Sequence, residues 1–72
     1  MALLPILSGK EIIQALERLG YYIVRQRGSH IRLHHPSKKP VTIPNYKSID
    51  RSLLRKILRD IQLDDEEFLK LL

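Results

Sequence analysis

The spacing of apolar residues changes twice along the chain, and this change limits the folds open to it. Apolar side chains recur every three or four residues near the start, alternate with polar ones in the middle and return to helical spacing toward the end. A helix, a group of strands and a second helix are therefore expected in that order. Because 72 residues suffice for one small domain, we predict a single domain over residues 1–72, with residues 1–7 as an N-terminal extension.

The first helix is predicted over residues 9–19. Ser8 and Glu11 have the spacing of a capping box, in which each side chain accepts a backbone N–H at the start of a helix. Apolar residues at helical spacing follow, and Gly20 is typical of a helix C-terminus. The sequence thus marks both ends of this helix.

Three short strands are predicted after it. Residues 21–26 are rich in β-branched and aromatic side chains, residues 30–34 alternate between apolar and polar, and residues 41–43 form a third strand. Gly28 and Ser29 mark the turn between the first two strands. Since the strands are close in sequence, we expect an antiparallel meander.

The second strand has a clear division between its faces. Alternation places its two apolar residues toward the core and His30, Arg32 and His34 on the other face. The first strand is apolar on both faces, so its orientation stays open. We interpret Tyr21 and Tyr22 as one core and one surface residue rather than as a pair that stacks on bases.

Helical spacing returns from Asp50 onward. An apolar stripe runs along one side of this second helix, and the opposite face carries basic residues. These basic residues are Arg51, Arg55, Lys56 and Arg59. Asp64 and Glu67 have the spacing of a second capping box, so a short final helix is expected over residues 65–71.

These elements predict a two-layer α+β domain of order α-β-β-β-α. A three-stranded antiparallel sheet is covered by two helices, and a short C-terminal helix follows. This is the order of double-stranded-RNA-binding domains, so the expected fold is dsRBD-like. Fold order alone does not establish a function.

The charge distribution favours a polyanionic partner. The net charge is +5, and residues 37–59 carry seven basic residues and one acidic residue, whereas residues 60–72 carry one basic and five acidic residues. Among polyanions, nucleic acid is the first partner that we expect a basic domain of this size to bind. The alternative from charge alone is a solvated basic face that keeps the protein soluble.

No cofactor or metal ion is expected. The chain has no cysteine, which excludes disulfides and thiolate ligands and fits a cytoplasmic setting. His30 and His34 share a face, but they are four steps apart along the strand, or roughly 13 Å, which is too far for one ion. No apolar run approaches the roughly 20 residues that span a bilayer, so no membrane partner is expected.

His30 is the one candidate catalytic residue. It follows the Gly28-Ser29 turn, and Arg25 and Arg27 precede it closely. Because RNA carries its own nucleophile, the 2′-OH, one histidine that takes this proton and nearby cations that bind the phosphate are enough for cleavage. The alternative is an ordinary surface histidine at the start of a strand. A Ser/His/Asp triad has little support, since every Asp is at position 50 or beyond.

Several segments together resemble the HicA toxins of bacterial and archaeal toxin–antitoxin modules, the YcfA-like family. The resemblance covers residues 8–72 and is strongest in the order and spacing of its motifs. The matching segments are Ser8–Glu11, Val24–His30, Val41–Pro44, Leu54–Arg59 and Glu66–Phe68. Four positions depart from the family pattern: Tyr46 stands where many members have His, Ser52-Leu53 replaces a usual Gly-Thr pair, and Gln62 replaces a frequent Gly.

The resemblance implies a dsRBD-like ribonuclease that cleaves mRNA, inhibits translation and arrests growth. It implies that His30, in the family's G-S-H motif, is the catalytic residue and that no metal is needed. It also implies a HicB-type antitoxin that covers this histidine. The consequence of Tyr46 for catalysis stays open, as do the RNA sequence preference and the oligomeric state.

Our hypothesis from the sequence is therefore a toxin ribonuclease, an mRNA interferase. His30 is the general acid or base, and the candidate RNA-binding residues are Arg25, Arg27, Gly28, Ser29, Lys47, Arg51 and Arg55. Two alternatives remain: a non-catalytic RNA-binding module that contacts phosphates through its basic face, and a protein-interaction domain that docks an acidic partner.

Overall fold

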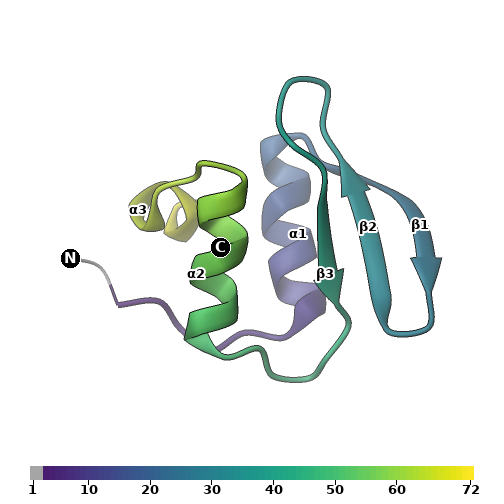
Figure 1. Cartoon of the computed structure of the whole chain (residues 1–72). Helices are drawn as coiled ribbons and strands as arrows, with labels where there is room; N and C mark the ends of the chain where they lie inside the picture. Colours follow the sequence, from purple (N-terminus) through teal and green to yellow (C-terminus); the bar gives the residue numbers. More distant parts are fainter. Residues whose placement is uncertain (1–2) are drawn as a thin grey trace.

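Six helices and strands follow one another along residues 3–72, the part of the chain that the computed structural model describes (Figure 1). They are α1 (Gly9–Leu19), β1 (Tyr22–Arg27), β2 (His30–His34), β3 (Val41–Pro44), α2 (Arg51–Asp60) and α3 (Asp65–Leu69). The predicted α-β-β-β-α order and the short final helix are both confirmed. No helix in this part of the chain is long and apolar enough to cross a membrane.

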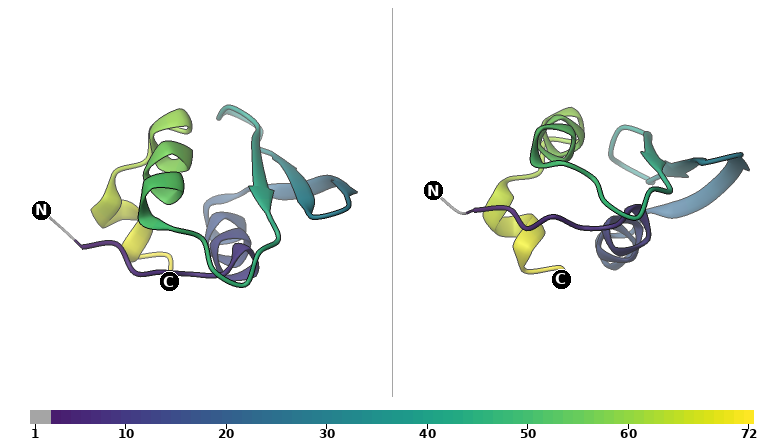
Figure 2. Two further views of the ribbon diagram at one scale, coloured as in Figure 1. Left: turned by 60° about the horizontal axis from the view of Figure 1, so that its bottom comes forward. Right: turned by 90° about the horizontal axis from the view of Figure 1, so that it is seen from below.

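The strands form one antiparallel sheet of order β1-β2-β3, which confirms the meander. Helix α1 lies behind β3, α2 lies beside β3, and α3 lies on the far side of α2 (Figure 1). Seen from below, α1 forms the second layer, and the hairpin of β1 and β2 projects beyond it (Figure 2). One face of the sheet, here called the outer face, is thus turned away from α1.

The core lies between α1, the inner face of the sheet and α2. Ile31 and Leu33 of β2 are buried, as alternation predicts, and so are Val41 and Ile43 of β3. Tyr21 is also buried, at 3% exposure, whereas Tyr22 is half exposed, which confirms their assignment to core and surface. The Tyr21 hydroxyl donates to the Lys39 carbonyl oxygen at 2.8 Å. Burial raises the pKa of the Tyr21 phenol above its ordinary value.

The segment before α1 belongs to the folded unit. Leu4 is fully buried and Leu7 nearly so, although the sequence suggests only an extension here. The Ile49 N–H donates to the Leu7 carbonyl oxygen at 2.8 Å, and the Arg51 Nε donates to the Leu4 carbonyl oxygen at 2.5 Å. Residues 1–2 of the predicted extension lie outside the described part of the chain. From residue 4 onward, this segment therefore completes the core and tethers α2.

Helix α1 has the predicted ends. The Ser8 hydroxyl accepts the Glu11 N–H at 3.1 Å, and the Glu11 carboxylate accepts the Ser8 N–H at 3.0 Å. Gly20 ends the helix with a φ of 113°, a left-handed conformation that glycine adopts readily.

Helix α3 differs in part from its prediction. The Asp64 carboxylate caps it by accepting the Glu66 N–H at 3.3 Å, so the expected pairing of Asp64 with Glu67 is wrong. The helix ends at Leu69 rather than at residue 71. Three acidic side chains occupy its first turn, where the positive end of the helix dipole favours negative charge.

Candidate active site

A two-residue turn sets the position of His30. Arg27 and His30 are paired across β1 and β2, so Gly28 and Ser29 alone form the loop. Gly28 has a φ of 55°, whereas Ser29 has no positive φ, a combination typical of type II′ turns with glycine first. The Asn45 N–H donates to the Ser29 carbonyl oxygen at 2.6 Å. The turn is thus held against the end of β3, and His30 begins β2 directly after it.

A β-bulge in β1 decides which side chains join His30. Ile23 is opposite Leu33, but the next pair is Arg25 with Arg32, so Val24 is the extra residue. Because side chains alternate across a strand, this insertion shifts Arg25 and Arg27 to the face that carries His30 and Arg32. Strict alternation from Ile23 onward would put both arginines on the inner face.

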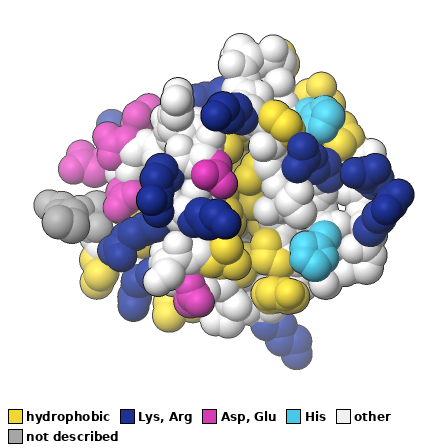
Figure 3. All heavy atoms as spheres, in the orientation of Figure 1, with side chains coloured by type: hydrophobic (Ala, Val, Ile, Leu, Met, Phe, Trp, Pro, Cys, Tyr) yellow, Lys and Arg dark blue, Asp and Glu magenta, His cyan; other side chains and the backbone are white. Residues whose placement is uncertain are grey.

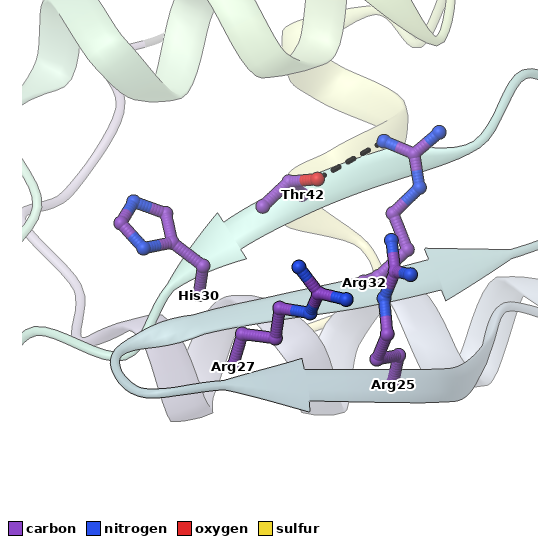
Figure 4. Close-up of a pocket in the computed structure, with 5 residues that line it drawn as sticks. All are labelled: Arg25, Arg27, His30, Arg32 and Thr42. Atoms are coloured by element: carbon purple, nitrogen blue, oxygen red, sulfur yellow. Dashed lines mark hydrogen bonds between the residues drawn. The ribbon is translucent and has the colours of Figure 1, made fainter.

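The outer face contains an open hollow of about 230 Å³ at this place. Arg25 and Arg27 of β1, His30 and Arg32 of β2, and Thr42 of β3 line it (Figure 4). The Arg32 Nη1 donates to the Thr42 hydroxyl at 3.0 Å, which holds this guanidinium across the sheet. Three strands therefore supply one imidazole, three guanidinium groups and a hydroxyl to a single site.

The electrostatic character of this hollow is cationic. No acidic residue is among those that line it, so its three guanidinium groups have no carboxylate partner within the lining. Lys, Arg and His side chains gather over the strands and α2 on this face, whereas most Asp and Glu side chains lie toward the α3 end (Figure 3). Arginine binds phosphate through paired N–H donors, so the hollow suits a phosphodiester next to an imidazole.

The structure brings only some of the predicted site residues together. Arg25, Arg27 and His30 line the hollow, and Gly28 and Ser29 form its turn. The other predicted residues, Lys47, Arg51 and Arg55, do not line it. Lys47 is exposed between β3 and α2, and Arg55 is exposed on α2. Arg51 is half-buried rather than on the solvent face, because its guanidinium binds the Leu4 carbonyl oxygen.

Two lining residues were missing from the predicted site. Arg32 could have been included, since alternation in the second strand already puts it on the face of His30. Thr42 lies between two buried residues of β3, so the same rule directs it outward. What the sequence could not reveal is the register that sets Thr42 opposite Arg32.

The remaining histidines have different surroundings. His35 Nε2 lies 3.0 Å from the Leu19 carbonyl oxygen, and His35 Nδ1 accepts the Ser37 N–H at 3.0 Å. His35 thus connects the end of α1 to the loop after β2, a structural role. Within residues 3–72, no three His, Cys, Asp or Glu side chains are grouped so as to hold a metal ion.

Tyr46, which stands where many members of the resembled family have His, is also not among the residues that line the hollow. Its side chain is 48% exposed, and its backbone carbonyl oxygen accepts the Gly9 N–H at 2.9 Å. Its side chain is therefore not part of the group around His30.

Comparison with protein families identifies the chain. The family model described as "HicA toxin of bacterial toxin-antitoxin" matches residues 9–63, which is most of the sequence. The chain belongs to the HicA toxin family. As a HicA-family protein it is the toxin of a toxin–antitoxin pair, and this membership implies an antitoxin partner. A search of curated proteins finds no match.

The match covers every element that builds the hollow. It begins at the first residue of α1 and ends after α2, so the sheet and the Gly28-Ser29 turn lie inside it. The buried Leu4 and helix α3 lie outside it. In this HicA-family chain, the residues that flank the matched region complete the core, whereas the hollow belongs to the matched part.

Proposed function

We propose that this HicA-family toxin is an endoribonuclease that cleaves mRNA without a metal ion and thereby inhibits translation. The observation that carries the proposal is the hollow in which His30 meets three arginines with no carboxylate among the lining residues. His30 acts as the general acid or base. Arg25, Arg27 and Arg32 bind the phosphodiester and stabilise the negative charge that develops on it.

The reaction uses the nucleophile that RNA itself carries. His30 accepts the proton of a 2′-OH, the 2′-oxygen bonds to the adjacent phosphorus, and the bond from phosphorus to the 5′-oxygen breaks. The leaving 5′-oxygen takes a proton from the imidazolium, directly or through a water molecule that relays it. The products are a 2′,3′-cyclic phosphate and a 5′-hydroxyl, so atoms and charges balance without any further reactant.

The antitoxin partner is, in this proposal, of the HicB type and covers the hollow. The hollow is open to solvent on the outer face of the sheet, so a bound protein can block access of RNA to His30. The cationic lining suits acidic side chains on that partner. Inhibition by this partner is measured by adding the antitoxin to the RNA-cleavage assay described next.

The test is RNA cleavage by the purified protein in the presence of EDTA. Wild type is compared with His30→Ala and His30→Asn, and with Lys70→Ala, an exposed substitution outside the hollow. Loss of general acid–base catalysis is expected to lower the rate about 10²- to 10⁴-fold in both His30 variants. Circular dichroism checks that all four proteins fold, and analysis of the RNA ends checks for the cyclic phosphate.

Two results would contradict the proposal. If folded His30→Ala cleaves as fast as wild type, His30 is not the catalytic residue. If wild type binds RNA but does not cleave it, and binding weakens steeply with salt, the protein is a non-catalytic RNA-binding module. A substrate with 2′-deoxyribose at the cleaved position is the matched control, because it lacks the nucleophile and must stay intact.

A further inference from the structure

A second group of side chains lies at the end of the outer face away from His30. Tyr22 of β1 and His34 of β2 are directly opposite each other in the sheet. Their ring centroids are 6.5 Å apart, and the rings meet edge to face. Tyr22 is 50% exposed and His34 is exposed, and neither belongs to the core cluster. The fold therefore leaves two adjacent flat rings open to solvent.

A second cationic hollow connects His34, one of the two rings, to the candidate active site. It has a volume of about 310 Å³ and is lined by Val24, Arg25, Arg32 and His34. Arg25 and Arg32 also line the hollow that contains His30, so the two hollows adjoin. Along β2, the four residue steps from His30 to His34 correspond to roughly 13 Å.

The arrangement has the two parts of a site for single-stranded nucleic acid. Such sites combine cations that follow the phosphate backbone with flat side chains on which unpaired bases stack. Here the paired residues Arg25 and Arg32 lie between the Tyr22–His34 pair and His30 along the strands, and both arginines line the two hollows. No acidic residue lines either hollow, so nothing in their lining repels a phosphate.

We propose that Tyr22 and His34 form a base-stacking subsite for single-stranded RNA, whose backbone crosses Arg25 and Arg32 to reach His30. This inference rests on the proposed ribonuclease function and names its substrate class. A base can stack on these rings only when it is unpaired and turned out, so duplex RNA is excluded. Because every base has a flat face, the subsite tolerates different sequences.

The experiment measures binding without cleavage. The probe is a short single-stranded 2′-O-methyl RNA that contains 2-aminopurine, whose fluorescence falls when it stacks; its blocked 2′-oxygen prevents the proposed reaction. Tyr22→Ala is expected to raise the Kd roughly 5- to 150-fold and to restore the fluorescence. Tyr22→Phe keeps the ring and is expected to bind like wild type. Tyr46→Ala is the matched control, because Tyr46 is similarly exposed but follows β3 at the His30 end of the sheet, away from the Tyr22–His34 pair.

A cleavage assay separates this inference from the proposed function. If both hold, Tyr22→Ala raises KM and largely keeps kcat, whereas His30→Ala lowers kcat. If the toxin does not cleave RNA but Tyr22→Ala still weakens binding and restores fluorescence, the stacking subsite holds and the ribonuclease fails. The stacking subsite is overturned if Tyr22→Ala binds and quenches like wild type, or if the same sequence as a duplex binds as tightly as the single strand.

Discussion

Gly9 is the residue at which the close packing of this small domain is clearest. A Cβ atom built there would lie 2.0 Å from the Pro44 carbonyl oxygen and 3.0 Å from the Asn45 Cα, both of them backbone atoms. The Gly9 N–H also donates to the Tyr46 carbonyl oxygen. The start of α1 therefore touches the chain that leaves β3, and a side chain at Gly9 would push the two apart.

Gly9→Ala is predicted to destabilise the protein by about 1–3 kcal/mol, because the new methyl group meets backbone that cannot yield without moving β3 or α1. Helix propensity alone predicts the opposite sign, since alanine in a helix is favoured over glycine by about 1 kcal/mol. Urea unfolding measures the free energy, with Lys10→Ala, an exposed neighbour, as the control. An increase in stability in Gly9→Ala would show that the contact is not tight.

At the scale of elements, the strand β1 and the helix α2 are where side-chain positions differ most from those expected from the sequence. The bounds of α1 follow directly from Ser8, Glu11 and Gly20, since caps are local signals. The faces of β2 follow from its clean alternation. In contrast, the bulge at Val24 depends on how β1 pairs with β2. Every residue of β1 is exposed, so no alternation of buried and exposed side chains marks the bulge in the sequence. The pairing of β1 with β2, rather than the residue pattern of β1 alone, therefore decides where Arg25 and Arg27 point.

Helix α2 presents its basic residues in two different ways. Arg51 binds the buried segment before α1, whereas Arg55, one turn later, is exposed. The helical period shows that both lie off the apolar stripe, but it carries no information about a segment more than forty residues earlier in the chain. For this reason, the hydrogen bond from Arg51 to Leu4 cannot be predicted from the sequence of the helix alone.

Arg51→Ala is predicted to lower the free energy of unfolding by about 1–2 kcal/mol, because the hydrogen bond from the half-buried, charged Arg51 side chain to the carbonyl oxygen of the buried Leu4 is lost. Arg55→Ala is the matched control on the same helix, and its effect on stability is expected to stay within about 0.5 kcal/mol. Thermal and urea unfolding of both variants compare them directly. Equal stability of the two would mean that the bond between Arg51 and Leu4 contributes little in solution.

At the scale of the whole molecule, the stability at alkaline pH depends on Tyr21. Its phenol is buried and donates to the Lys39 carbonyl oxygen, and burial raises its pKa above the ordinary value of 10.0. The unfolded chain therefore releases this proton first. The protonated Tyr21 phenol therefore contributes its full share of the folding stability below about pH 10. This contribution falls as the pH rises toward the higher pKa of the folded state.

Tyr21→Phe is predicted to show a weaker loss of stability above pH 10 than wild type, because it has no phenol to ionise. At neutral pH, it is expected to lose about 1 kcal/mol with the hydrogen bond to Lys39. Urea unfolding over a pH series measures both effects, and Tyr22→Phe, which removes an exposed phenol, is the control. A Tyr21→Phe profile parallel to that of wild type would assign the alkaline loss to other groups.

The separation of charge along the molecule has a consequence for how it meets a partner. Acidic side chains crowd the first turn of α3, while the cationic hollows lie on the strands at the far end from it (Figure 3). Such a molecule has a permanent dipole moment, and the field of a polyanion exerts a torque on it before any contact is made. The toxin is therefore expected to meet the RNA substrate proposed above with the strands leading and α3 trailing, which raises the fraction of collisions that occur in a productive orientation.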